Sequence, residues 1–212
     1  VGYTAWWYDA STGAISEVTD YSMEYTYTFT GTEDIIYEVR YTPNVVKYVV
    51  KHYFQNVNDD GYGEPVEETK YGTADTVIGD VHKAAAGFYY IPYLHPTIAP
   101  EESTVIEIYY DRLYRLVLFD LGEGGYGVEP IYAKVGTEID LGTPERPGYS
   151  FNGWEYENGT DITTATYIIP SDDVTENNNP DIIIKAKWTA GTAKYTVVYW
   201  KENAEPNKDG SY

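Results

Sequence analysis

The sequence predicts a mostly β protein built from small domains in tandem, and three observations support this. The first is the choice of apolar residues, because 25 Tyr and 5 Trp stand against a single Met in 212 residues. Aromatic and β-branched side chains favour pleated, half-buried surfaces, whereas sustained runs of the helix-favouring residues Leu, Ala, Glu and Lys are missing. The second is dense turn punctuation by Gly, Pro, Asn and Asp. The third is an internal repeat.

Three sequence echoes recur at one spacing of about 147 residues. The run 48–56 aligns with 195–203, and the run 34–41 aligns with 181–188. The third echo pairs Gly2-Tyr3 and Trp7 with Gly148-Tyr149 and Trp154. A spacing shared by three segments favours duplication of one structural unit over coincidence.

Short strand-like runs subdivide this repeat. The runs 105–110 and 114–119 are β-branched and aromatic and lie close together, and the runs 37–41 and 48–53 form a similar pair. We interpret each pair as the last strand of one module and the first strand of the next. The predicted domains are therefore 1–42 (the C-terminal part of a repeat module), 43–112 (a complete module), 113–191 (a second, different module) and 192–212 (the start of the next one).

Helix signals are weak. A short helix ending at Gly87 is expected over Ala84–Ala86, and another ending at Gly142 is expected over Thr137–Leu141. Elsewhere turn residues interrupt any helical period, so we predict little helix.

Charge and cysteine content exclude several classes of function. The formal net charge is −20, from 34 acidic and 14 basic residues. Such a surface repels nucleic acid and anionic membranes, so neither is expected as a partner. There are no cysteines, so disulfides, thiolate catalysis and Cys-based metal sites are impossible. No apolar run is long enough to span a membrane.

Aromatic residues are the predicted core of each small module, because one buried ring removes about 150–250 Å² from water. In the stretch Gly148–Trp154, alternation places Tyr149, Phe151 and Gly153 on one face and Trp154 on the other. The predicted core residues are Phe119, Tyr149, Phe151, Trp154 and Trp188 in one module, and Tyr53, Phe88, Ile106 and Ile108 in the preceding one. Sugar stacking is the alternative role for Trp154 and Trp188.

One loop offers ligands for a metal ion. Against the calcium-loop template, oxygen side chains stand at Asn56, Asn58, Asp60, Glu64 and Glu67, and Gly61 is at the turn. The first position is Asn instead of Asp, and no helices flank the loop. We therefore expect a simple hairpin loop, with calcium as the alternative and no other cofactor.

No catalytic site is predicted, and the protein is not expected to be an enzyme. The histidines His52, His82 and His95 are scattered without ligand-like spacing, and no nucleophile motif or phosphate-binding loop is present. The acidic stretch 172–179 is expected to be a solvated loop. A Lys–Asn isopeptide cross-link from Lys185 or Lys187 to this Asn-rich loop is a further hypothesis.

The segment 114–188 resembles the Listeria–Bacteroides repeat, also called the B-repeat of internalin. The residues that support the resemblance are a strand with a Gly-rich turn at 122–127, Gly136-Thr137, the run Pro144–Trp154, and the closing Ala186-Lys187-Trp188. The segment 46–112 is similar to mucin-binding-type repeats of Gram-positive surface proteins, through 48–53, Gly72-Thr73, 87–89 and 108–112.

These resemblances imply β-grasp-like modules with little or no helix, in a secreted protein attached to a Gram-positive-type cell wall. They imply a structural stalk or spacer of an adhesin-like surface protein, whose partners are the neighbouring modules of the same chain. Two alternatives stay open: a module that binds host glycans or mucin, and a subunit that assembles with further copies by strand exchange.

Overall fold

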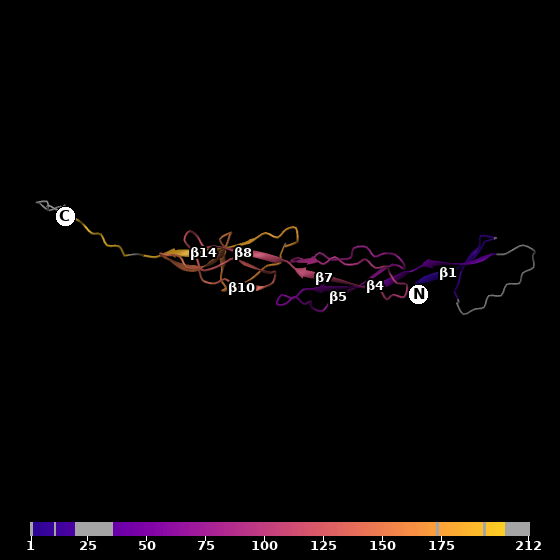
Figure 1. Ribbon diagram of the computed structural model, residues 1–212. Helices are drawn as coiled ribbons and strands as arrows, with labels where there is room; N and C mark the ends of the chain where they lie inside the picture. Colours follow the sequence, from indigo (N-terminus) through magenta and orange to yellow (C-terminus); the bar gives the residue numbers. More distant parts are fainter. Residues whose placement is uncertain (1, 11, 20–35, 173, 193, 202–212) are drawn as a thin grey trace, which may run out of the picture. The chain divides into compact units, whose positions relative to one another are not determined.

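The structure is a computed structural model that describes residues 2–10, 12–19, 36–172, 174–192 and 194–201 (Figure 1). Within these ranges every regular element is a β-strand and none is a helix, which confirms the mostly β class. No helix in the described part of the chain is long and apolar enough to cross a membrane.

The chain divides into two compact units, which are described separately. Unit 1 comprises Val1–Arg115, Ala133–Thr137 and Ile168–Pro180. Unit 2 comprises Leu116–Tyr132, Glu138–Tyr167 and Asp181–Tyr212.

The first sheet of unit 1 has three antiparallel strands in the order β2-β1-β3. They are β1 (Tyr3–Asp9), β2 (Ile15–Glu17) and β3 (Tyr37–Pro43). The β1–β2 hairpin closes where Gly13, at φ 72°, donates its N–H to the Asp9 carbonyl at 2.8 Å. Trp6 lies opposite Arg40 of β3, and Tyr8 lies opposite Ile15 of β2.

The second sheet of unit 1 has four strands in the order β5-β4-β7-β6. They are β4 (Val45–Phe54), β5 (Val66–Thr73), β6 (Phe88–Tyr90) and β7 (Val105–Arg112). The central pair β4–β7 is parallel, and β5 and β6 add antiparallel edges. A parallel pair requires a long crossover between its strands. Here the crossover consists of β5, β6 and the connecting segments 55–65, 74–87 and 91–104.

The core of this sheet lies on one face, because alternate residues of β4 and β7 point inward. The buried residues form one cluster: Val46, Tyr48, Val50, Ala74, Ile78, Ile98, Ile106, Ile108 and Tyr110. Ala74, Ile78 and Ile98 come from the irregular crossover, so that segment covers the apolar face in place of a helix.

Unit 2 contains most of a five-stranded sheet in the order β12-β11-β14-β8-β9. Its strands are β8 (Tyr114–Asp120), β9 (Ile131–Lys134), β11 (Tyr149–Tyr156), β12 (Asp161–Ile162) and β14 (Ile182–Ala190). The pair β8–β14 is parallel, and β11 pairs antiparallel with β14 and β12. A separate two-stranded sheet joins β10 (Glu138–Asp140) to β13 (Thr166–Ile168).

Both helix predictions are wrong. Residues 137–141 contain strand β10, and Ile139 and Leu141 are buried while Glu138 and Asp140 are exposed. This alternation has the period of a strand, which the Gly stop signal does not reveal. The segment Ala84–Ala86 is irregular and leads into a turn that closes when Phe88 donates its N–H to the Ala85 carbonyl at 3.1 Å. The β-grasp assignment stays a prediction.

Candidate functional site

The four-stranded sheet and the five-stranded sheet each contain one parallel strand pair. In unit 1, β4 and β7 are in register from Val49 opposite Val105 to Phe54 opposite Tyr110. In unit 2, β14 and β8 are in register from Ile182 opposite Val117 to Lys185 opposite Asp120. In each pair the earlier strand of the chain lies directly beside the last strand of its sheet.

The predicted aromatic core of unit 2 forms around Trp154, whose side chain is 4% exposed. The ring centroids of Phe119 and Phe151 are each 5.2 Å from that of Trp154. The Phe151 ring also contacts Trp188, whose indole N–H donates to the Leu121 carbonyl at 2.9 Å. The structure thus brings four of the five predicted residues together.

A β-bulge makes this cluster possible, because simple alternation places Phe151 and Trp154 on opposite faces. The register shifts between these two residues, and Gly153 between them has φ 101°, which non-glycine residues rarely adopt. Tyr149, the fifth predicted core residue, lies instead at the surface, with the Arg146 guanidinium 3.9 Å above its ring.

The second predicted core set divides between two faces. Ile106 and Ile108 are buried in unit 1, and Phe88 packs against their cluster. Tyr53 points to the opposite face, because it alternates with the inward residues of β4. Its ring stacks on Tyr109 at 4.8 Å, and its hydroxyl donates to Glu107.

That outer face carries a tyrosine cluster that the sequence did not reveal. The Tyr62 hydroxyl donates to Asp111 at 2.6 Å, and the Tyr89 hydroxyl donates to the other oxygen of the same carboxylate at 3.2 Å. Burial, followed by the hydrogen bond to Asp111, raises the pKa of Tyr62 to about 12. Tyr62 lies within the predicted calcium loop, where the template assigns it no role.

The predicted calcium ligands do not converge on one point. The Asp60 carboxylate accepts a hydrogen bond from the Lys134 ammonium at 2.8 Å. Glu67 on β5 forms an ion pair with Lys51 at 2.9 Å. Asp59, which the template omits, closes the loop by accepting the Asn56 side-chain amide and the Gly61 N–H. These two bonds, the Asn56 bond first, lower the pKa of Asp59. The described residues contain no group of three or more His, Cys, Asp or Glu placed to hold a metal ion, and the calcium alternative stays a prediction.

Three cationic side chains in unit 1 donate hydrogen bonds to backbone carbonyls near residue 112, the predicted module boundary. Arg112 donates to the Gln55 carbonyl at 2.8 Å and to the Val135 carbonyl at 3.0 Å. Arg115 is buried and donates to the carbonyls of Pro170 and Pro180. Lys134, besides its bond to Asp60, donates to the Asp59 carbonyl at 2.9 Å.

These contacts show that the boundary is packed. Leu113, the residue between β7 and β8, is buried. Its N–H donates to the Gly87 carbonyl, and its own carbonyl accepts the Val135 N–H. Residues from both sides of the predicted boundary thus share one compact unit, with no exposed linker between 112 and 114.

His52 is fully buried on β4, where its Nδ1 contacts the Tyr110 hydroxyl at 2.8 Å. Its Nε2 faces Glu68 at 3.6 Å. Burial, followed by the charge of Lys83, lowers the pKa of His52 below its usual 6.5, and Glu68 opposes this only in part. The fold therefore holds the neutral imidazole.

We expect unit 1 to lose stability as the pH falls below 6.5. The unfolded chain binds the His52 proton first, so the contribution is complete above pH 6.5 and is lost between 6.5 and the lower folded pKa. Urea unfolding measured from pH 5 to pH 7.5 should show this slope in the wild type and a flatter one in His52→Gln. Equal slopes in the two proteins contradict the assignment.

The other predicted loci form local contacts. His82 contacts Asp80 at 2.6 Å, and this bond, followed by one from Tyr93, lowers the pKa of Asp80 to about 2. His95 contacts the Ile78 carbonyl. Lys187 pairs with Asp161 on β12, not with the Asn-rich loop, and the isopeptide hypothesis stays untested.

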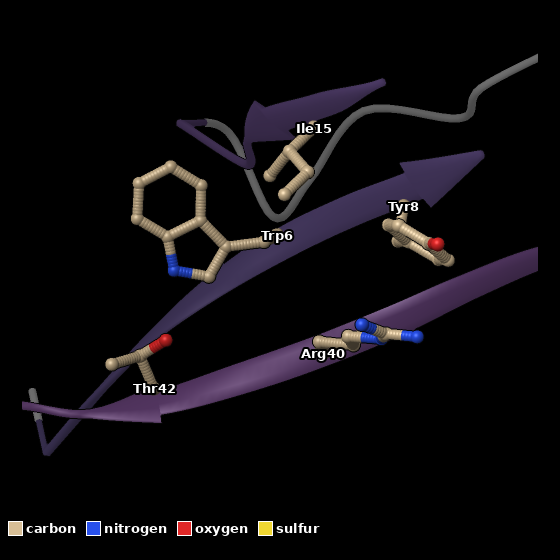
Figure 2. A pocket seen from close by; sticks show the side chains of 5 residues that line it. All are labelled: Trp6, Tyr8, Ile15, Arg40 and Thr42. Carbon is tan, nitrogen blue, oxygen red and sulfur yellow. The ribbon is translucent and has the colours of Figure 1, made fainter. Parts of the chain in front are cut away.

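A hollow of about 330 Å³ lies on one face of the sheet β2-β1-β3 (Figure 2). Trp6 and Tyr8 of β1, Ile15 of β2, and Arg40 and Thr42 of β3 line it. The Arg40 guanidinium lies 3.8 Å from the centre of the Tyr8 ring. The core predictions did not include these residues.

No protein-family model matches the chain, and neither a curated protein nor a solved structure matches it. The resemblance to repeats of bacterial surface proteins therefore rests on the motifs in the sequence.

Proposed function

We propose that the chain is a structural stalk or spacer segment of a secreted, cell-wall-attached surface protein, and that its modules are built to bear tension. The observation that carries this proposal is the parallel pairing of an early strand with the last strand of the same sheet, in β4–β7 and in β8–β14.

Parallel pairing determines how tension acts on the hydrogen bonds. When the start of β4 and the end of β7 are pulled apart, the two strands slide along each other. All hydrogen bonds between the registered residues are then loaded together, and no bond can break alone. An antiparallel hairpin pulled at its open end instead loses its bonds one after another. Tension transmitted along the chain therefore loads each parallel strand pair in shear, the direction in which the pair resists separation.

The packed boundary supports the same function. Arg112, Arg115 and Lys134 bind backbone carbonyls from segments far apart in sequence. Hydrogen bonds from charged donors contribute more than neutral ones, about 1.5–3 kcal/mol each. A spacer without disulfides gains resistance at its module boundary from such contacts.

The remaining features fit an extracellular, non-enzymatic role. The net charge of −20 keeps neighbouring chains apart. Strand exchange with a second copy is the weaker alternative. Its support is the run 194–201, in which Tyr195, Tyr199 and Trp200 are exposed and no described strand pairs with it.

The proposal predicts that the unfolding force of the β5-β4-β7-β6 sheet depends on the direction of pulling. Because the chain has no cysteine, paired Cys substitutions give unique attachment points. Handles at Val45→Cys and Tyr114→Cys shear β4 against β7. Handles at Val45→Cys and Tyr71→Cys peel β5 from β4, because Tyr71 lies opposite Lys47 at the same end. Single-molecule pulling should give a several-fold higher force for the first pair.

The two attachment pairs share one position, and all three replaced side chains are exposed. A reference melt of each variant checks that the substitutions leave the fold intact. Equal forces in the two geometries reject the tension-bearing role.

A further inference from the structure

We propose that the hollow on the β2-β1-β3 sheet binds an uncharged glycan, with one sugar ring stacked against Trp6. This binding function goes beyond the spacer role, and it rests on observations confined to unit 1.

The register brings the lining residues to one face of the sheet. Trp6 is opposite Arg40, Tyr8 is opposite Ile15, and Thr42 lies two residues beyond Arg40 on β3. Alternate residues of a strand share a face, so Trp6 and Tyr8 lie on the same face of β1. Figure 2 shows these two side chains along β1, with Ile15 on one side of them and Arg40 and Thr42 on the other.

The corresponding strands of unit 2 carry other side chains on this face. Trp7 pairs with Val39 as Trp154 pairs with Ala186, so the two strand pairs correspond at an offset of 147 residues. Trp6 itself falls at the bulge of β11 that contains Gly153 and has no direct counterpart there. Beyond the bulge, Tyr8 corresponds to Glu155, Arg40 to Lys187 and, by strand register, Ile15 to Asp161.

The same hairpin face is therefore charged in unit 2 and aromatic in unit 1. In unit 2 it is occupied by the ion pair of Lys187 with Asp161. Because antiparallel strands pair in unit 2 with charged residues on this face, strand pairing by itself does not require the aromatic residues of unit 1.

The polar groups around the hollow are arranged as hydrogen-bond donors. The Glu38 carboxylate accepts hydrogen bonds from Nε and Nη2 of Arg40 at 3.1 and 2.9 Å. These bonds hold the guanidinium over the Tyr8 ring. Within the described part of the chain, Nη1 of Arg40, Nε1 of Trp6 and Oγ1 of Thr42 make no hydrogen bond. These groups surround an apolar surface and are free to bond to a ligand.

This combination matches the chemistry of a pyranose. Such a ring has a face of C–H groups that stacks on an indole, and a rim of hydroxyls that accept from Arg, Trp and Thr donors. A volume of about 330 Å³ lies at the low end of ligand pockets, which suits one or two sugar rings. Glu17 and Glu38 stand opposite Trp6 and Tyr8, so the rim disfavours an acidic sugar.

The test uses the full chain on an array of uncharged glycans built from hexoses and N-acetylhexosamines, followed by titration calorimetry with the strongest binder. Lactose and sialyllactose form a neutral and acidic pair, and decaproline probes for peptide binding instead. The key variant is Trp6→Ala with Tyr8→Glu, in which Ala removes the indole and Glu is the residue at the corresponding position of unit 2. Arg40→Lys also introduces the corresponding residue of unit 2 and serves as an independent, milder variant.

We expect uncharged glycans to bind the wild type, to bind the double variant at least about tenfold more weakly and to bind Arg40→Lys about threefold more weakly. Trp200→Ala, which removes an exposed indole elsewhere, should bind like the wild type. A wild type that binds no uncharged glycan overturns the proposal, as does undiminished binding by the folded variants. A preference for sialyllactose, or binding of decaproline alone with the same dependence on Trp6, also overturns it.

Discussion

Trp154→Ala is expected to lower the free energy of unfolding of unit 2 by about 3–5 kcal/mol, which is the usual cost of deleting a buried large aromatic side chain. The Trp154 ring contacts both Phe119 and Phe151, and its indole N–H donates to the Gly142 carbonyl at 3.2 Å. Removal of the indole leaves a cavity between two rings and deletes the hydrogen bond to the Gly142 carbonyl.

Thermal and urea unfolding measure this loss, and hydrogen exchange assigns it to residues of unit 2. Trp200→Ala is the matched control, because the Trp200 side chain is 77% exposed and should change the stability by less than about 0.5 kcal/mol. An unchanged melting temperature for Trp154→Ala contradicts the core assignment.

Ile108→Ala is expected to destabilise unit 1 by about 2–5 kcal/mol. Ile108 is fully buried at the centre of β7, opposite His52 on β4. The lost methyl groups leave a void within the strand pair that we propose to bear tension, so the unfolding force in the shear geometry should also fall.

Val105→Ala on the same strand is the control for this variant. Val105 is about half exposed and points to the opposite face of the sheet, so it loses little buried area on truncation. If the two variants unfold at the same urea concentration, the inward face of β7 is not the core.

Local sequence patterns were sufficient for four of the strands. The β-branched and aromatic runs predicted at 37–41, 48–53, 105–110 and 114–119 coincide with β3, β4, β7 and β8. The run 195–200 has the same composition as β4, yet it forms no strand in the described residues. The β4 segment becomes a strand by pairing with β5 and β7, and composition alone cannot supply such partners.

The candidate sites depended more on contacts that are distant in sequence. The calcium template counts oxygen atoms along one loop, but Asp60 is paired with Lys134, 74 residues away. The aromatic hollow joins β1 to β3, which are far apart in sequence, and its separation from the core follows only from the register. Trp6 and Trp7 are adjacent in sequence, so composition cannot tell which of them faces the core.

By itself the sequence determined that this protein is mostly β and strongly acidic, and it predicts an internal repeat at about 147 residues. These properties follow from local propensity, pattern and charge, which are features of the chain before it folds. Only the tertiary structure decided that early and last strands pair in parallel, that Phe151 and Trp154 meet across a bulge, and that aromatic residues line an outer face. Each of these depends on strand register, and a shift of one residue moves every side chain to the other face.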